Sequence, residues 1–175
     1  KAQVDDAEKS KSELLHLIGD LTARMRQIFS LRFDEINGHF SRIFEELFGG
    51  GHACLHFTDP EDVLISGIEI EVQPPGKIIK SLSAIALYFA ILKVRPSPFC
   101  VLDEIEAALD DSNVARFAAY LRRMCDRTQF IVITHRRGTM DGADVLYGVT
   151  MQDEGESKLL RLNVDELAEK MGFAT

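Results

Sequence analysis

The sequence of 175 residues lacks the segments that would place it in or across a membrane. No stretch approaches the run of about 20 apolar residues that a spanning helix needs, and the polar N-terminus lacks the apolar region of a signal peptide. The three cysteines, Cys54, Cys100 and Cys125, form no Cys-x-x-Cys pair. We therefore expect no membrane partner and a reducing, cytoplasmic setting. Because the chain opens at Lys1 inside a helical pattern, we also expect a fragment of a longer protein.

The sequence also lacks an excess of positive charge. Its formal net charge is −8 at pH 7, whereas a duplex-binding module usually carries a basic face that neutralises phosphates. Basic residues gather only locally, at Arg122-Arg123 and Arg136-Arg137. A solvated helix face or a salt bridge is the commoner role for the first pair. If the parent protein handles DNA, most of its contact surface should lie outside this chain.

Helical and strand patterns alternate along the chain. Residues 1–47 contain no proline and repeat apolar residues at helical spacing, first as in one strand of a coiled coil and later with phenylalanines that suit a core. Gly49-Gly50-Gly51 should end this helix, since glycine adopts the left-handed conformations of a C-cap. The other predicted elements are strands at 52–57, 67–72, 99–102, 130–134, 145–151 and 158–162, and helices at 84–94, 112–125 and 164–171. This alternation predicts an α/β fold, with a parallel-rich sheet flanked by helices.

Two carboxylates follow an apolar strand. Residues 99–102 are Phe-Cys-Val-Leu and lead directly into Asp103 and Glu104, and ligands of open α/β sheets bind at the carboxyl ends of strands. P-loop ATPases use such a strand end to set a metal-orienting Asp beside a water-activating Glu. Asp103 would hold Mg²⁺ through a water, and Glu104 would orient or deprotonate the attacking water. Taken alone, two acids at a solvated strand end explain the pattern equally well.

A histidine follows the next apolar strand. Residues 130–133 are Phe-Ile-Val-Ile and lead into Thr134, His135 and Arg136. Neighbouring strands would bring His135 to the same sheet edge as Asp103 and Glu104, where it can hydrogen-bond a γ-phosphate or the attacking water. A lone histidine after a strand is usually structural, but its pairing with the acidic strand favours a catalytic role. The helix between the two strands should be capped by Asp111 or Ser112.

The loop that cradles nucleotide phosphates is missing. The Walker A pattern is G-x-x-x-x-G-K-[ST] between a strand and a helix. The one Gly-Lys pair in the chain, Gly76-Lys77, follows two prolines and reads as a turn. The sequence thus carries the water-activating part of an ATPase without the phosphate cradle, and another polypeptide segment must supply that cradle.

A weaker pattern lies in the first strand. His52, Cys54 and His56 alternate and would share one face, as the start of a zinc site might require. No fourth ligand follows at a useful spacing. Coincidence on a strand face is therefore the commoner explanation.

Several segments together resemble the C-terminal ATPase head segment of SMC (structural maintenance of chromosomes) proteins, most closely the bacterial or archaeal type. The resemblance runs from about residue 10 to residue 162. The segments that carry it are Phe48-Gly49-Gly50-Gly51, Thr58-Asp59-Pro60-Glu61-Asp62, Gln73-Pro74-Pro75-Gly76-Lys77, Ala84 to Asp110, Thr128 to Arg136 and Ala143 to Met151.

The resemblance implies the C-terminal half of an ABC-type (P-loop NTPase) ATPase head with an N-terminal coiled-coil stub. Residues 1–35 would form the base of the coiled coil, and residues 36–175 the C-terminal lobe of the head. Asp103 and Glu104 would be Walker B, with Asp103 on ATP and Mg²⁺ and Glu104 catalytic. Ala107-Ala108-Leu109-Asp110 would be the D-loop, in which Ala108, Leu109 and Asp110 meet the nucleotide. His135 would be the catalytic switch histidine.

The resemblance also implies partners and a process. ATP hydrolysis by the complete head would drive head engagement and release in chromosome condensation and segregation, in the cytoplasm at the nucleoid. The implied partners are an N-terminal SMC head segment carrying Walker A, a second SMC head, a kleisin subunit, and DNA through the full complex. Without Walker A, this chain alone should be inactive.

The kleisin's winged-helix domain would dock on the outer surface of this half of the head. Residues 156–172 are candidates for that surface. Possible apolar contacts within it are Leu159, Leu162, Leu167 and Met171. Core packing explains these residues equally well.

One departure and two rival interpretations stay open. The family's signature motif, Leu-Ser-Gly-Gly-Glu, is absent: Ser83 runs directly into Ala84 and aligns before the motif. One rival is the head of a coiled-coil DNA-repair ATPase of the same superfamily, which the turn at 73–77 disfavours. The other is a catalytically inert, kleisin-binding head fragment, against which the intact Asp103, Glu104 and His135 argue for the parent protein.

Overall fold

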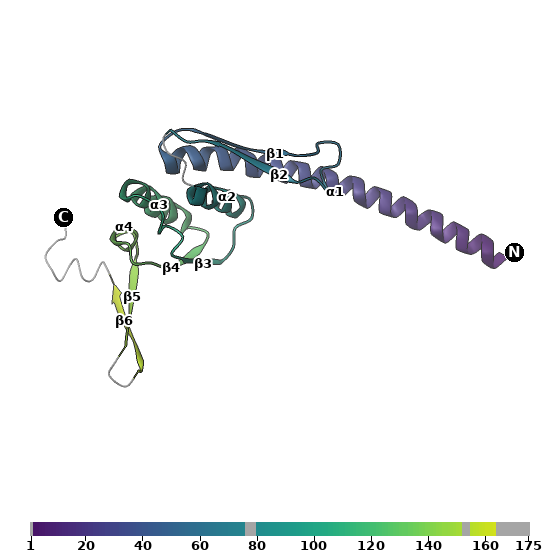
Figure 1. Ribbon diagram of the computed structural model, residues 1–175. Coiled ribbons are helices and arrows are strands. Elements are labelled where there is room, and N and C mark those ends of the chain that lie inside the picture. Colours follow the sequence, from purple (N-terminus) through teal and green to yellow (C-terminus); the bar gives the residue numbers. More distant parts are fainter. Residues whose placement is uncertain (1, 76–79, 152–154, 164–175) are drawn as a thin grey trace. The chain divides into compact units, whose positions relative to one another are not determined.

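The computed structural model describes residues 2–75, 80–151 and 155–163 (Figure 1). Its elements form two compact units. One contains α1, β1, β2 and residues 83–95, and the other contains the elements after residue 95. Within the described ranges, no helix combines the length and the apolar character needed to cross a membrane.

The first unit is organised by one long helix, α1 (Ala2–Phe48), which confirms the helix predicted over 1–47. In its first half the apolar stripe is exposed, whereas its second half buries phenylalanines. Phe44 is fully buried and stacks on Phe48, with ring centroids 4.0 Å apart. The helix crosses residue 35 without a break. The division there into a coiled-coil base and a lobe remains a prediction.

The three glycines after α1 end the helix as predicted. Gly49, Gly50 and Gly51 have φ angles of 69°, 137° and 91°, which glycine adopts without the steric cost of a Cβ. The amide of Gly50 donates to the carbonyl of Glu45 at 2.7 Å. A Cβ on Gly51 would lie 2.5 Å from the carbonyl oxygen of Gln73. The glycines therefore turn the chain back and let it approach β2 closely.

The strands β1 (His52–Phe57) and β2 (Ile68–Gln73) form an antiparallel pair, here called the β1–β2 ribbon. This confirms the strands predicted at 52–57 and 67–72. Figure 1 shows the ribbon lying along the second half of α1. Phe57 stacks on Phe33 at 3.9 Å. The side chain of Asn37 accepts from the amide of Leu55 at 2.8 Å and donates to its carbonyl at 3.1 Å, so α1 fixes the position of β1.

The helix α2 (Lys80–Val94) completes the first unit. It begins four residues before the predicted start, because no glycine or proline separates Lys80 from Ala84. It ends before Pro96, as predicted. With α1 and the ribbon it encloses an apolar groove of about 350 Å³. The apolar residues that line this groove are Phe29, Phe33, Ile36, Leu55, Ile68, Ile70, Leu87 and Ile91.

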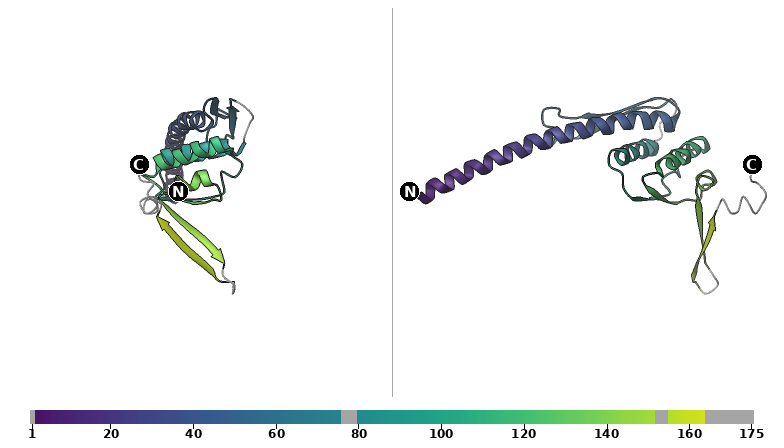
Figure 2. Two further views of the ribbon diagram at one scale, coloured as in Figure 1. Left: turned by 90° about the vertical axis from the view of Figure 1, so that its left-hand side faces the viewer. Right: turned by 180° about the vertical axis from the view of Figure 1, so that it is seen from behind.

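The second unit begins with a parallel strand pair, β3 (Phe99–Asp103) and β4 (Gln129–Ile133), joined through α3 (Asp111–Met124). Each of these elements matches a predicted one to within a residue. Figures 1 and 2 show α3 on one side of the pair. Cys100 and Leu102 are buried. The opposite face is exposed and mostly apolar: it carries Phe99, Val101, Ile131 and Ile133, together with Gln129 and Asp103.

The second unit ends in a short helix and a hairpin. The helix α4 (Arg137–Met140) was not predicted, because four residues are too few to show a helical period. The strands β5 (Val145–Met151) and β6 (Ser157–Asn163) pair with each other and stand clear of α3 in both views of Figure 2. They confirm the strands predicted at 145–151 and 158–162. The helix predicted at 164–171 lies outside the described residues.

Candidate functional site

The candidate site lies where β3 and β4 end. The two strands run in parallel with Asp103 opposite Ile133, so the residues that follow emerge at one edge. The amide of Glu104 donates to the carbonyl of Ile133 at 2.9 Å. This hydrogen bond extends the ladder by one residue and sets the first turn after β3 against the end of β4.

Glu104 and His135 meet at this edge. The Nδ1 atom of His135 lies 3.1 Å from Oε1 of Glu104. Both side chains are more than half exposed, at 56% for Glu104 and 66% for His135. An ion pair exposed to this degree adds little to stability. The contact therefore contributes little to folding.

The backbone of Glu104 is unusual. Its φ angle is 47°, and Glu104 is the one non-glycine residue with positive φ among those described. A side chain in this region costs on the order of 1–3 kcal/mol and persists where the surroundings hold it, often at functional sites. Two hydrogen bonds hold this conformation. The Glu104 amide donates to the Ile133 carbonyl, and the Ala107 amide donates to the Glu104 carbonyl at 3.0 Å.

Asp103 is the last residue of β3 and is exposed. Within the described part of the chain, its carboxylate takes part in no side-chain hydrogen bond or ion pair. An unengaged carboxylate at a strand end can bind Mg²⁺ directly or accept a hydrogen bond from its hydration water. The residues present thus fit a magnesium ion, and Asp103 is the residue that would face it.

The segment predicted as the D-loop is a tight turn that leads into α3. The amide of Leu109 donates to the carbonyl of Glu106 at 2.9 Å. Ala108 is exposed, whereas Leu109 is buried. Asp110 caps α3, accepting from the amide of Asn113 at 2.8 Å. The prediction of a cap at Asp111 or Ser112 is wrong by one or two residues, because the helix begins at Asp111.

Sequence reasoning missed Arg136. Its guanidinium donates to the carbonyl of Leu109 and to Oδ1 of Asp111, both at 2.9 Å. Arg136 therefore ties the turn after β3 to the residue that follows His135, and it fixes the spacing of the two loops. Its position next to His135 was the available signal, but the pair with Arg137 suggested a nucleic-acid contact instead.

Glu106 was also missed. It is fully buried, and neither carboxylate oxygen has a hydrogen-bond partner among the described residues. A buried polar group without a partner carries a cost on the order of 1–3 kcal/mol. Burial of Glu106 could not be predicted from its neighbours, because it lies between apolar residues in a segment that reads as a solvated loop.

Other residues that the sequence pointed to do not belong to this edge. Ser83 is inside α2, buried and without a hydrogen-bond partner in the described ranges. The guanidinium of Arg122 lies 3.9 Å from the Asp144 carboxylate, as the salt-bridge interpretation expected. Leu159 and Leu162 are in β6, whereas Leu167 and Met171 fall outside the described residues.

Comparison with known proteins defines the class. Residues 76–158 match the family model described as the RecF/RecN/SMC N terminal domain. A crystal structure of the Smc head domain with an extended coiled coil, bound to the C-terminal domain of ScpA and derived from Pyrococcus furiosus, superposes with a TM-score of 0.86 at 36% identity. That match covers 99% of this chain and 46% of the other. The fold is that of an SMC ATPase head with its coiled coil.

Two further relatives specify the family. The chromosome partition protein Smc of Bacillus subtilis (strain 168) is 51% identical over 177 residues, which cover 95% of this chain and 15% of that protein. A structure from work on ATP-driven dimerization and DNA-stimulated activation of SMC ATPases has a TM-score of 0.70 at 38% identity, covering 84% of this chain and 95% of the other. The chain belongs to the SMC family. It spans about 15% of the length of the curated relative.

Proposed function

We propose that this chain is the half of an SMC ATPase head that activates water for ATP hydrolysis. Asp103 and Glu104 serve as Walker B, residues 107–110 as the D-loop, and His135 as the switch histidine. One observation carries the proposal: the Glu104 carboxylate and the His135 imidazole lie 3.1 Å apart at the carboxyl ends of two parallel strands. Through head engagement and release, this activity would serve chromosome condensation and segregation, with DNA held by the full complex.

Each residue has a distinct task in this proposal. Asp103 would hold the hydration water of a Mg²⁺ ion, which when bound would supply positive charge against the phosphates. Glu104 accepts the proton of the attacking water. His135 orients Glu104 through their 3.1 Å contact and can donate toward the γ-phosphate from its other nitrogen. Arg136 positions the D-loop relative to His135 through its bond to the Leu109 carbonyl.

The missing phosphate cradle must come from a second segment. Parallel sheets are normally covered on both faces, yet β3 and β4 expose Phe99, Val101, Ile131 and Ile133. An N-terminal head segment that carries Walker A would add strands beside this pair and cover that face. This chain matches 46% of the P. furiosus head chain, which therefore contains further residues outside the match.

The catalytic assignment is tested in a complete head assembled with its Walker A segment. Glu104→Gln keeps the size of the side chain but cannot accept a proton, so ATP turnover should fall about 100-fold or more while ATP still binds. Engaged head dimers should then accumulate with ATP. Asp103→Asn should instead weaken Mg-ATP binding and prevent engagement.

The controls for this test use acids outside the site. Glu69→Gln, on the β1–β2 ribbon, should leave turnover unchanged. Size-exclusion chromatography with ATP separates the engaged from the free heads. Near-normal hydrolysis by a monomeric Glu104→Gln head would show that Glu104 is only a solvated acid at a strand end.

The chain alone should neither bind ATP tightly nor hydrolyse it, because the amides and lysine of Walker A provide most phosphate contacts. Isothermal titration calorimetry with ATP and Mg²⁺ on the isolated chain measures this directly. Micromolar affinity would contradict a site divided between two segments.

The β5–β6 hairpin is our candidate for kleisin docking, since the P. furiosus Smc head was solved bound to the C-terminal domain of ScpA. The register divides the hairpin into two faces. One face gathers exposed apolar side chains, namely Tyr147, Val149, Met151 and Leu159. In the register, Leu162 is the partner of Leu146.

The register also provides a matched pair of variants. Leu159→Glu places a charge on the apolar face, where Leu159 is 63% exposed, and should weaken capture of a ScpA-type C-terminal domain at least tenfold. Leu160→Glu places the same charge on the opposite face, where Leu160 is 49% exposed, and should not. Circular dichroism checks that both variants stay folded. Equal binding by both would move the docking surface elsewhere.

A further inference from the structure

The outward face of the β1–β2 ribbon carries an unusual set of polar side chains. Alternation in β1 places His52, Cys54 and His56 on the face that points away from Ala53 and Leu55, which are buried. The antiparallel register places Glu71 directly opposite Cys54, and Glu69 opposite His56. β2 therefore adds two carboxylates to the face on which β1 places its histidines and cysteine.

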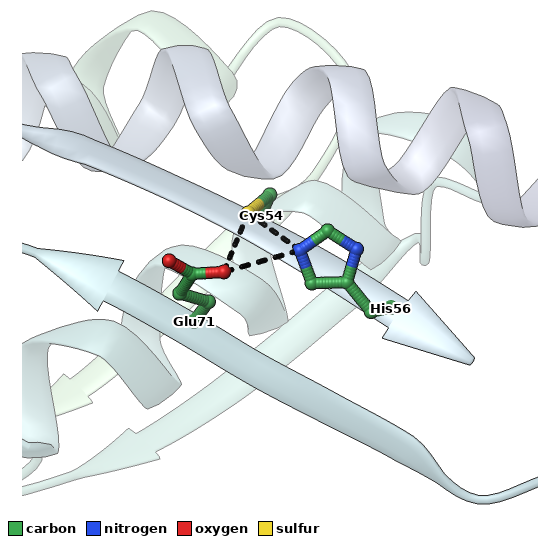
Figure 3. A group of neighbouring side chains, drawn as sticks. All are labelled: Cys54, His56 and Glu71. Carbon is green, nitrogen blue, oxygen red and sulfur yellow. Dashed lines mark hydrogen bonds and ion pairs between the residues drawn. The ribbon is translucent and has the colours of Figure 1, made fainter. Parts of the chain in front are cut away.

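Three of these side chains converge (Figure 3). The Cys54 sulfur lies 3.1 Å from Nε2 of His56 and 4.0 Å from Oε2 of Glu71. The distance from His56 Nε2 to Glu71 Oε2 is 3.3 Å. The three ligand atoms all lie within 4.8 Å of one another.

These spacings suit a tetrahedral ion. With zinc bonds of about 2.3 Å to sulfur and 2.0–2.2 Å to nitrogen or oxygen, the ligand atoms of a tetrahedron lie about 3.4–3.6 Å apart. The observed distances of 3.1, 3.3 and 4.0 Å bracket that range.

The donor types restrict the ion. A thiolate, an imidazole and a carboxylate together suit zinc and similar transition-metal ions, whereas Mg²⁺ and Ca²⁺ prefer oxygen ligands alone. Three protein ligands leave a fourth position. Glu69 and His52 flank the cluster on the same face, and a water can take this place in an open site.

We propose that Cys54, His56 and Glu71 form a zinc-binding site that clips β1 to β2. The ligands come from both strands, so a bound ion would fix the register of β1 and β2 beside the second half of α1. This site is separate from the ATPase edge and uses none of its residues.

The metal-free state is held by weaker interactions of the same groups. The sulfur of Cys54 contacts His56, and Glu71 forms an ion pair with His56 when that ring is protonated. Burial, together with the neighbouring Glu71 carboxylate, raises the pKa of the Cys54 thiol. Metal binding should therefore release a proton from the thiol, because the thiolate is the form that binds.

Cobalt(II) is a suitable probe, since a cysteine ligand gives it a thiolate-to-metal charge-transfer absorption in the near ultraviolet. Titration of Co²⁺ into the full chain, kept reduced, should produce this absorption with one ion per chain, and Zn²⁺ should displace it. Cys54→Ser should abolish the absorption. His56→Asn and Glu71→Gln should each weaken Zn²⁺ binding by more than about tenfold, because loss of a residue that only hydrogen-bonds to a metal ligand already costs about 10–100-fold in metal affinity.

Cys125→Ser is the matched control, because Cys125 is an exposed thiol outside the ribbon. It should leave the absorption and the zinc affinity unchanged. The proposal is overturned if the unmodified chain shows no charge-transfer absorption with excess Co²⁺, or if Cys54→Ser retains it. Loss of the absorption in Cys125→Ser but not in Cys54→Ser would assign the metal to the wrong thiol and also overturn it.

Discussion

The β1–β2 ribbon and the β3–β4 pair are both two-stranded sheets, but their faces differ. The ribbon buries Ala53 and Leu55 beside α1 and turns a polar face outward. The β3–β4 pair buries Cys100 and Leu102, yet its second face is also mostly apolar. The ribbon is thus amphipathic in the way expected of a sheet with one solvated side. The β3–β4 pair has the composition of a sheet covered on both sides.

The two sheets differ in how far they depend on other segments of the protein. A polar outer face is stable in water without further cover, whereas an exposed apolar face marks a place for a partner. The candidate site lies at the edge of the incompletely covered sheet. We infer that completing the sheet and completing the ATP site are one event, which would keep the isolated half inactive.

A pair of side-chain truncations tests whether the ribbon and the β3–β4 face differ in burial. Leu55→Ala removes a side chain that is 4% exposed and should cost about 2–5 kcal/mol of unfolding free energy. Val101→Ala removes one that is 53% exposed and should change stability by less than about 0.5 kcal/mol. Urea denaturation of both variants gives the two values.

The same pair sharpens the comparison in a complete head. There Val101→Ala should become clearly destabilising, because the Walker A segment would cover it. If Val101→Ala is already as costly as Leu55→Ala in the chain alone, the β3–β4 face is covered without a partner and the comparison fails.

Much of this architecture could be predicted from the sequence, for physical reasons that differ between elements. Strands such as 99–102 are short apolar runs between strong breakers, and α1 has a sustained helical period, so both were found. The start of α2 was placed too late, because residues 80–83 carry neither a strong period nor a breaker. The four residues of α4 are too short to leave any pattern.

The candidate site was predictable only where chemistry coincides with a strand end. Asp103, Glu104 and His135 each follow an apolar run, and parallel pairing then brings Glu104 and His135 together. Arg136 and Glu71 could not be placed, because their roles depend on the conformation of a turn and on cross-strand register. Buried Glu106 was unpredictable for a similar reason: burial of a loop residue depends on how the loop folds back.

Glycine substitutions compare how tightly the two units are built. Gly51, in the first unit, has a φ of 91°, and a Cβ there would lie 2.5 Å from the Gln73 carbonyl oxygen. Gly155, in the β5–β6 turn, has a φ of 78° with no atom within 4 Å of its Cβ position among the described residues. Gly51→Ala should therefore cost about 2–3 kcal/mol, from strain and overlap together. Gly155→Ala should cost about 1 kcal/mol, from strain alone.

Thermal melts of the two glycine variants provide the measurement. Equal losses would mean that backbone strain dominates at both positions and that the close approach of Gly51 to β2 relaxes freely. In that case the first unit would be no more tightly packed than the hairpin.

Glu106 tests whether burial of an unpaired carboxylate destabilises the second unit, and whether the segment added in a complete head removes that cost. Replacing this buried carboxylate with an apolar side chain of similar volume, as in Glu106→Met, should stabilise the chain by about 1–2 kcal/mol, because no partner is lost among the described residues. In a complete head the gain should shrink or reverse if the added segment supplies a hydrogen-bond donor. Denaturation of both forms distinguishes the outcomes, and a destabilised isolated chain would show that Glu106 already has a partner there.

His39 provides the smallest test, and it concerns the packed first unit. Burial lowers the pKa of His39 below 6.5, and the charges of Arg42 and Lys93 lower it further. The unfolded chain therefore binds a proton at His39 more readily than the folded chain does, so stability should be lost as pH falls through 6.5. His39→Gln cannot titrate, and its melting temperature should fall less on acidification, by on the order of 1–2 °C. His16→Gln, on the exposed first half of α1, is the matched control. If both variants keep the acid sensitivity of the parent chain, desolvation of His39 contributes nothing measurable, and the closer packing of the first unit does not extend to this side chain.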